Sequence, residues 1–326
     1  MYKRNISKEI LEAFEDTPVV FLQGARQVGK TTLVRELLAD DLSATYVTLD
    51  NATTLAAAAD DPVGFLMNQP RPLVIDEVQR VPELLLAIKE AVDKDRKPGQ
   101  FLLTGSANLL TLPLVNDSLA GRMQIITLWP LSETEKRGQS AGFVEQLFNA
   151  DSFRSRLAGA SDLVHTLTVG GFPEAVARKG QKRRNAWFEA YLTSIVERDI
   201  RDIARIQETA TILKLARLLA TRTGTLLNQS EMSRTMQVPN ATLGRYIGLL
   251  EKVFLIHFLP AWSPNLGKRL AKAPKVYMVD CGLAAHLMGV DADRLSADPH
   301  IAGPLLETYV VGEILKQRTW STIDVT

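Results

Sequence analysis

The sequence predicts an α/β fold built on a parallel β-sheet. Between residues 18 and 104, short apolar stretches alternate with helical patterns, and this alternation is typical of a parallel sheet. A glycine-containing loop separates the first apolar stretch from the first helical pattern, and the third apolar stretch ends in two adjacent carboxylates. Because ligands bind at the carboxyl edge of such sheets, a functional site is expected there.

Each element is marked by its apolar pattern and by the turns around it. We expect strands at 18–23, 44–49, 72–76 and 100–104, and a helix over 31–38. After Leu131 the pattern is mainly helical, with a turn at Gly170–Pro173 and a long amphipathic stretch from Asn185 to Ala204, followed by a helical run over 206–220.

Composition and charge restrict the class of protein. The chain has 326 residues, 46% hydrophobic and 23% charged, which predicts a globular protein of two or three domains. The 38 basic and 37 acidic side chains leave a net charge of +1, so no global field favours nucleic acid or membrane partners. Cys281 is the only cysteine, which excludes an internal disulfide and a multi-cysteine zinc site. With no signal peptide or membrane-spanning pattern visible, we expect a cytoplasmic chain.

The glycine loop has the spacing of a phosphate-binding loop. Its backbone N–H groups must turn inward around phosphate oxygens, which requires glycine at Gly24 and Gly29. Lys30 supplies a positive charge to the terminal phosphates, and Thr31 offers its hydroxyl to magnesium at the start of a helix. The predicted cofactor-binding residues are Gly24, Ala25, Arg26, Gln27, Val28, Gly29, Lys30, Thr31 and Thr32. The loop therefore predicts binding of a nucleoside triphosphate, ATP with Mg²⁺.

Acidic residues at the end of the third strand supply a second element of the site. Asp76 is predicted to hold Mg²⁺ together with Thr31, directly or through water. Glu77 is the candidate catalytic base that orients and deprotonates the water attacking the γ-phosphate. A second acid beside the metal ligand favours hydrolysis over binding alone.

Two further catalytic positions are predicted beyond the acids. The fourth strand ends at Leu103-Thr104-Gly-Ser106, where a hydroxyl could position the lytic water, and Ser106 ranks above Thr104 for that role. Arg122 is a candidate arginine finger for the γ-phosphate of its own or a neighbouring subunit. The alternatives are an ordinary strand-ending turn and a surface arginine. Arg4 and Ile6 are the first candidates for contact with adenine.

Several motifs together indicate a family. The chain resembles one group of AAA-type ATPases in GARQVGKTTL, PLVIDEVQRVPELL, FLLTGSANLL, and SLAGR followed by ITLWPLSETE. It also resembles the carboxy-terminal domain of unknown function that accompanies this core in bacteria and archaea, in GGFPEA, IVERDI, KVYMVDCGLA and LLETYVVGEILK. The resemblance implies an AAA core, a winged helix and the beginning of a restriction-endonuclease-like fold, and it matches Arg122 to the Gly-Arg motif of the group. The expected domains are an AAA P-loop ATPase core over 1–130, a helical lid over 131–205, a winged helix-turn-helix over 206–265 and a partial endonuclease-like α/β domain over 266–326.

The winged helix is also predicted by the order of elements. A short helix at 228–236, a turn at Val238–Asn240, a helix over 241–252 and a strand over 254–259 follow that order. The candidate DNA-contacting residues are Arg234, Asn240, Thr242 and Arg245, with basic runs at Lys268, Arg269, Lys272 and Lys275 and at Lys179–Arg184. The alternatives are a protein-docking module and solvated basic faces.

Other reactive residues receive simpler interpretations. Glu307 and Glu313 are candidates for the early acid of a nuclease, but the chain ends without the following Asp and Glu-x-Lys strands. We therefore expect a truncated chain, exposed carboxylates and no nuclease activity. His165, His257 and His286 are isolated and do not suggest a metal site, and Cys281 is expected to be a buried small apolar residue.

Two hypotheses of function follow. The first is an ATPase that acts as an ATP-driven switch or motor, with DNA or protein as partner and a homo-oligomer as one arrangement. The second is a DNA-binding module in which ATP is a regulatory ligand with little turnover. A small-molecule kinase fits less well because of the paired acids and the predicted winged helix. A GTPase fits less well because no Asn-Lys-x-Asp sequence occurs.

Overall fold

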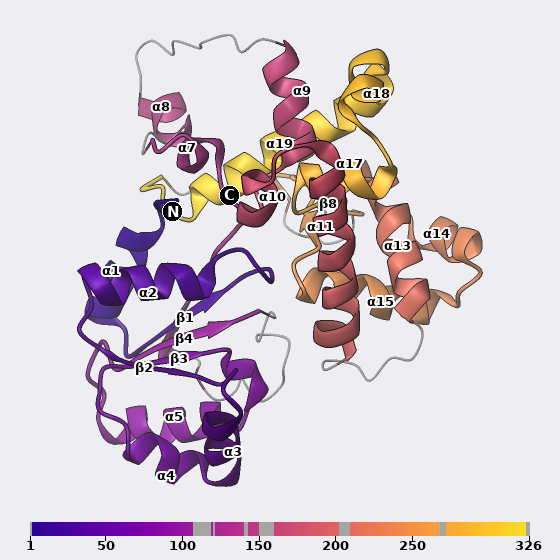
Figure 1. The fold of residues 1–326 in the computed structure, drawn as a ribbon. Helices are drawn as coiled ribbons and strands as arrows, with labels where there is room; N and C mark the ends of the chain where they lie inside the picture. The colour runs from indigo at the N-terminus through magenta and orange to yellow at the C-terminus, as the bar shows by residue number, and fades with distance from the viewer. Residues whose placement is uncertain are drawn as a thin grey trace. The chain divides into compact units, whose positions relative to one another are not determined.

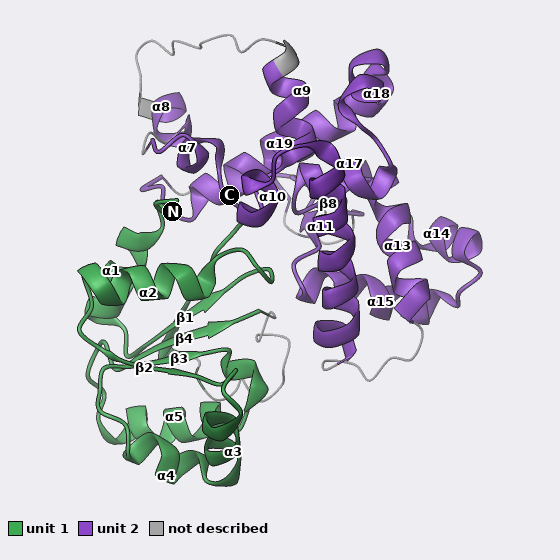
Figure 2. Cartoon of the chain, viewed as in Figure 1, with its two compact units in different colours: residues 1–129 green, residues 130–326 purple. Residues whose placement is uncertain are grey.

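The chain forms two compact units, residues 1–129 and residues 130–326 (Figure 2). The computed structural model describes residues 2–106, 119, 121–139, 143–149, 160–201, 209–265, 267 and 272–323. The two units are considered separately below.

The amino-terminal unit contains a five-stranded, fully parallel sheet. Its strands are β1 (Val19–Gln23), β2 (Thr45–Thr48), β3 (Leu73–Asp76), β4 (Phe101–Gly105) and β5 (Met123–Thr127), in the order β2-β3-β4-β1-β5. The helices are α1 (Ser7–Asp16), α2 (Lys30–Asp40), α3 (Ala52–Asp60), α4 (Pro62–Met67) and α5 (Leu84–Lys94), with a 3₁₀ turn η1 (Val78–Arg80). The predicted α/β fold with a parallel sheet is confirmed, and β5 adds a strand to those predicted.

Helices cover both faces of this sheet, as its sequence requires. Every residue of β1, β3 and β4 is buried, and each strand is a mainly apolar run without alternation, as is typical of strands covered on two faces. One face packs its alternate residues, such as Phe21, Ile75 and Leu103, into a cluster with apolar residues of α3, α4 and α5. Helices α1 and α2 lie on the other face (Figure 1).

The strand order brings three loop-bearing strand ends together. Strand β4 lies between β1 and β3, and its register pairs Gln23 with Gly105 and Ile75 with Leu103. The loop after Gln23, the acids after Ile75 and the hydroxyls near Gly105 therefore meet at the carboxyl edge of the sheet. The candidate site lies at this edge.

The carboxy-terminal unit is mainly helical. Its helices are α7 (Glu133–Lys136), α8 (Phe143–Asn149), α9 (Ala160–Val169), α10 (Pro173–Ala177), α11 (Gln181–Ser194), α13 (Thr209–Thr221), α14 (Gln229–Met236), α15 (Asn240–Lys252), α17 (Cys281–Met288), α18 (Ala292–Ala297) and α19 (Pro299–Arg318). A π-helical segment, η3 (Ile195–Ile200), continues α11. Strands β6 (Thr225–Leu226), β7 (Ile256–Leu259) and β8 (Lys275–Met278) form an antiparallel sheet in the order β6-β8-β7.

Several elements of this unit coincide with those expected. Helices α14 and α15, with β7 after them, lie where the sequence pattern predicts two helices and a strand. The predicted helical run over 206–220 begins outside the described residues and continues in α13. Within the described part of the chain, no helix is both long and apolar enough to cross a lipid bilayer.

Candidate functional site

The loop between β1 and α2 has a backbone that requires glycine at two positions. Gly24 has a φ of +153°, and a Cβ on it would lie 2.2 Å from the carbonyl oxygen of Leu128. Gly29, the residue before α2, has a φ of +102°, in the left-handed region that favours glycine. The loop therefore combines a close backbone approach at its beginning with a left-handed turn into the helix at its end.

Lys30 is buried inside this loop. Its Nζ donates hydrogen bonds to the carbonyl oxygens of Gly24, at 2.9 Å, and Ala25, at 3.0 Å. The ammonium group therefore lies within the turn of the loop at the amino-terminal end of α2, where the helix dipole also favours negative charge. Two positive features converge on the same small volume, which suits an anion.

Asp76 accepts hydrogen bonds from hydroxyl groups on three different elements. The Thr31 hydroxyl lies 3.2 and 3.0 Å from its two carboxylate oxygens, the Tyr46 hydroxyl donates to Oδ2 at 2.9 Å, and the Thr104 hydroxyl donates to Oδ1. Burial and the neighbouring Asp76 raise the pKa of Tyr46, so this phenol stays protonated as a donor. The structure thus joins Thr31 and Asp76, the two predicted metal ligands.

Glu77 adopts a left-handed conformation directly after β3. Its φ is +62°, and its backbone N–H donates to the Thr104 hydroxyl at 3.1 Å. Thr104 thus links the backbone of Glu77 to the carboxylate of Asp76. This contact places Thr104, ranked below Ser106 on sequence grounds, directly against both acids.

Gln79 connects Glu77 to Ser106. The Gln79 side-chain amide donates to the Glu77 carboxylate and, at 3.0 Å, to the Ser106 hydroxyl. Ser106 therefore reaches the acids through a glutamine that sequence reasoning missed. Gln79 and Tyr46 were missed because the turn after Glu77 and the position of β2 beside β3 determine their contacts, and neither follows from residue type.

Arg122 lies at the opposite edge of the sheet from the phosphate loop. It precedes β5, its carbonyl accepts a hydrogen bond from the backbone N–H of Val19 at the beginning of β1, and its Nε lies 2.6 Å from Asp93 of α5. The five residues of β5 span about 16 Å between this edge and the carboxyl edge. Arg122 therefore does not join the other candidate residues within this unit.

Arg4 contacts the loop from the segment before α1. Its guanidinium group donates to the carbonyl oxygens of Val28 and Trp129. Ile6, the other residue considered for adenine contact, is 1% exposed and belongs to the core. Arg4 is thus bound to the backbone of the loop itself.

The carboxylates considered for a nuclease lie in two separate polar contacts of the carboxy-terminal unit. Glu307 accepts hydrogen bonds from Lys275, at 2.7 Å, and Tyr277, at 2.6 Å, which lower its pKa. Glu313 binds Lys316 at 2.8 Å and accepts the backbone N–H of Glu133 at 3.1 Å. Each carboxylate therefore has a basic partner on the chain. The expectation of an exposed carboxylate was wrong for Glu313, whose side chain is only 12% exposed because it packs against Lys316.

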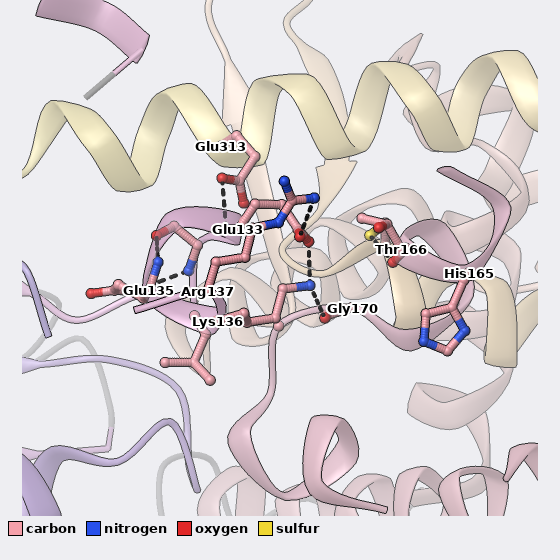
Figure 3. A network of polar contacts seen from close by, with 12 residues as sticks. Glu133, Glu135, Lys136, Arg137, His165, Thr166, Gly170 and Glu313 are labelled. Carbon is pink, nitrogen blue, oxygen red and sulfur yellow. Dashed lines mark hydrogen bonds and ion pairs between the residues drawn. The ribbon is translucent and has the colours of Figure 1, made fainter. Parts of the chain in front are cut away.

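Glu313 belongs to a polar network around a small cavity (Figure 3). Lys136 donates to the Gly170 carbonyl at 3.0 Å and pairs with Glu133, and Asp280 accepts the Gly171 N–H at 2.6 Å. Burial, and then the charge of Asp280, raise the pKa of Cys281 to about 12, so the thiol is protonated and a poor nucleophile. The network joins the predicted GGFP turn to the segments around Cys281 and Glu313. Its hydrogen bonds and ion pairs therefore serve to hold these segments together.

The residues considered for DNA contact differ in exposure. Arg234, Asn240 and Arg245 are exposed and Thr242 is partly exposed. Lys272 is also exposed, whereas Lys275 is paired with Glu307, and Lys268 and Arg269 lie outside the described residues. In the second basic run Arg184 is buried and bonded to the carbonyl of Arg178, so that run is not simply a solvated face.

Comparisons with known proteins bear on both units. Residues 16–136 match the family model described as AAA domain, and residues 160–294 match a domain of unknown function (DUF8612). The amino-terminal unit thus matches the AAA domain model over most of its length, and it has the α/β fold typical of P-loop ATPases. The Walker-type ATPase of Pyrococcus abyssi is similar in fold, with a TM-score of 0.51 and 16% identity, covering 88% of this chain and 96% of that one.

Relatives in sequence are uncharacterised proteins. The chain is 32% identical over 320 residues to proteins of Mycobacterium tuberculosis and Mycobacterium bovis, an overlap of 97% of this chain and 65% of each relative. It is 30% identical over 225 residues to a protein of Haemophilus influenzae, which covers 66% of this chain and 52% of that protein. The chain thus spans just under two thirds of the length of its mycobacterial relatives.

Proposed function

We propose that this chain binds ATP with Mg²⁺ at the loop 24–32 and hydrolyses it, acting as an ATP-driven switch or motor. The observation that carries the proposal is the convergence of Thr31, Thr104 and Tyr46 on Asp76, directly beside a glycine loop that encloses the Lys30 ammonium. A hydroxyl and a carboxylate joined at the end of a phosphate-type loop match the chemistry of Mg–nucleotide binding.

The residues present suit a triphosphate. The left-handed turn at Gly29 and the beginning of α2 supply backbone N–H groups, and Lys30 supplies a charge for the terminal phosphates. No side chain projects from Gly24 or Gly29 into the loop. The cradle therefore has the room and the sign of charge that phosphate oxygens need.

The residues present also suit magnesium. Thr31 and Asp76 offer hydroxyl and carboxylate oxygens, the hard donors that Mg²⁺ prefers, and Mg²⁺ would neutralise charge on the β- and γ-phosphates. Thr104 and Tyr46 hold the Asp76 carboxylate in a fixed orientation through their hydroxyl groups. Both hydroxyls therefore act as positioning groups for the metal ligand.

Glu77 is the proposed catalytic base. Its backbone is held by Thr104 and its carboxylate by Gln79, and Gln79 also contacts Ser106. Ser106 is proposed to respond to the terminal phosphate through this glutamine. Arg122 is proposed to act only on the nucleotide of a second copy of the chain, because of its position at the opposite edge of its own sheet.

Two substitutions test the proposal. Lys30→Ala should abolish binding of a fluorescent ATP analogue, and Glu77→Gln should preserve binding while removing phosphate release. Unchanged nucleotide affinity in Lys30→Ala would refute ATP binding at this loop. Absence of phosphate release by the wild-type protein, with intact binding, would refute hydrolysis. Light scattering with ATP measures the assembly, since a hexamer favours a motor and a monomer favours a switch.

A second candidate function is DNA binding regulated by ATP with little turnover. It is favoured by the α14–turn–α15 arrangement, in which Arg234, Asn240 and Arg245 are exposed, and by the antiparallel strands that follow. The winged-helix interpretation carries this second candidate, whereas the helical lid over 131–205 belongs to the ATP-driven switch. The endonuclease-like end over 266–326 is likewise a proposal. Arg234→Ala with Arg245→Ala should weaken duplex DNA binding and reduce its salt dependence. DNA affinity that these changes leave intact would instead favour a protein partner for this region.

A further inference from the structure

Arg4 is a charged residue in a buried position. It precedes α1 and is 6% exposed. Its Nη1 donates to the carbonyl oxygen of Val28 at 3.0 Å, and its Nη2 donates to that of Trp129 at 2.6 Å. A guanidinium group remains protonated in proteins and presents its donors in a rigid fork. Arg4 therefore ties two distant backbone segments together through charge-assisted hydrogen bonds.

The first of these segments is the phosphate loop. Val28 lies within the loop, and a Cβ on the adjacent Gly29 would lie 3.7 Å from Arg4 Nη1. The carbonyl groups of the loop need hydrogen-bond donors. Lys30 supplies donors to Gly24 and Ala25, and Arg4 supplies one to Val28. Arg4 thus supports the backbone of the loop at Val28.

The second segment is the end of the amino-terminal unit. Trp129 is the last residue of that unit, and Leu128 before it donates its backbone N–H to Gln23 at 2.7 Å. A Cβ on Gly24 would lie only 2.2 Å from the Leu128 carbonyl oxygen, so Gly24 packs directly against this carbonyl. Both the beginning and the end of the phosphate loop therefore contact residues 128–129, one directly and the other through Arg4.

The chain is anchored again immediately after this segment. In the carboxy-terminal unit, Leu131 donates its N–H to the Gly171 carbonyl at 2.7 Å and accepts a hydrogen bond from Lys316 at 3.0 Å. Pro130 alone separates Trp129 from Leu131, and its ring fixes φ. A single residue thus separates Trp129, which Arg4 holds, from the anchored Leu131.

We infer that Arg4 is a positioning residue that couples nucleotide binding at the phosphate loop to the backbone at Trp129–Leu131. The inference rests on the proposed function, because the nucleotide is the ligand whose binding orders the loop. In this arrangement, a movement of the Val28 carbonyl shifts the Arg4 guanidinium group. The hydrogen bond from Arg4 Nη2 then passes this shift to the Trp129 carbonyl. Arg4 contacts the loop backbone and acts through it.

Hydrogen–deuterium exchange of the 326-residue chain, with and without Mg–ADP, tests the coupling. In the wild type, we expect nucleotide to slow exchange in peptides covering 24–31 and 128–133. Arg4→Ala should weaken ADP binding about tenfold, as loss of a charge-assisted hydrogen bond predicts. At saturating ADP, Arg4→Ala should keep protection over 24–31 and lose the response over 128–133.

Arg4→Lys separates charge from geometry. It retains the positive charge but lacks the rigid fork that reaches both carbonyls. We expect its ADP affinity to lie within a few-fold of the wild type, with the response over 128–133 still lost. If Arg4→Ala does not fold, this variant alone decides the matter.

Arg71→Ala is the matched control. Arg71 is an exposed arginine of the same unit that lies over the Phe101 ring at 4.6 Å and bonds to Gln100, at the amino end of the strands. This variant should keep both nucleotide responses. The inference is overturned if both Arg4 variants keep the nucleotide response over 128–133. It is also overturned if the wild type shows protection over 24–31 but no response over 128–133. No protection over 24–31 in the wild type overturns the proposed function as well.

Discussion

The Thr31 hydroxyl lies within hydrogen-bond distance of both Asp76 carboxylate oxygens, at 3.2 and 3.0 Å, although 45 residues separate the two along the chain. Thr31 lies in the first turn of α2 and Asp76 ends β3, so their contact depends on the strand order, in which only β4 separates β3 from β1. This pair forms the centre of the proposed metal site, and the first prediction concerns it.

Removing either oxygen ligand should reduce the contribution of Mg²⁺ to nucleotide affinity. For Asp76→Asn and Thr31→Val, we expect the affinity gain from Mg²⁺ to fall at least about tenfold, because Asn lacks the negative charge of the carboxylate and Val lacks the hydroxyl oxygen. Titration of a fluorescent ATP analogue in Mg²⁺ and in EDTA measures this gain. Thr31→Ser keeps the hydroxyl and should behave as the wild type. An undiminished gain in Asp76→Asn would contradict the assignment of this ligand.

Gln79 should affect turnover more than substrate affinity. Because its amide holds the Glu77 carboxylate, Gln79→Ala should lower kcat by about tenfold to a hundredfold with KM nearly unchanged. Steady-state phosphate release measures both constants. The control is Gln69→Ala, a glutamine that precedes the amino end of β3. A rise in KM with unchanged kcat would exclude the positioning role.

The substitution Gln79→Glu is a second test of the contact between Gln79 and Glu77. A carboxylate beside Glu77 disfavours ionisation of the pair, so the acid limb of the pH–rate profile should move to higher pH. A purely structural role for Gln79 would lower activity equally at all pH values.

If Arg122 takes part in catalysis, it should do so at the nucleotide of a second copy of the chain. In the wild type, turnover per chain should rise when copies of the chain assemble, and Arg122→Ala should lack this rise. The reason is that Arg122 and the phosphate loop of the same chain lie at opposite edges of the sheet, so Arg122 can reach only the nucleotide of another copy. Mixing Arg122→Ala with Lys30→Ala tests this, since each protein supplies what the other lacks. Recovery of turnover on mixing is the expected result. Full loss of turnover in dilute, monomeric Arg122→Ala, with no recovery on mixing, would contradict it.

His257 should make the carboxy-terminal unit less stable in mild acid. Burial, and then the charge of Arg318, lower the pKa of His257 from 6.5 to about 4. Between these values the unfolded chain binds the proton and the folded unit does not, so stability falls as pH falls from 6.5 toward 4. The full effect is about 3 kcal/mol in the free energy of unfolding.

The measurement is urea unfolding at pH 7, 6 and 5, followed by fluorescence of Trp187, Trp262 and Trp320. His257→Gln should lose much less stability than the wild type over this range. Parallel curves for the two proteins would show that another group controls the acid sensitivity.

The main features of the amino-terminal unit could be predicted from the sequence because they are local. An apolar run buried on both faces, a glycine loop and a following helix are encoded by neighbouring residues, and the strand, loop and helix appear in that order. The acids at the end of β3 were identified for the same reason. In the carboxy-terminal unit, local pattern also located α14, α15 and β7, whereas their role remains a proposal.

Contacts between distant segments could not be predicted in this way. The fold places Thr104 on Asp76, Gln79 between Glu77 and Ser106, and Arg4 between Val28 and Trp129. It also places Arg122 at the far edge of the sheet, although its residue type suggested a place near phosphate. Residue type and spacing thus identify which groups can bind phosphate and metal, because short sequence motifs contain the residues that this chemistry requires. Strand order and register select which of these groups meet, because side chains touch across a sheet irrespective of their separation along the chain.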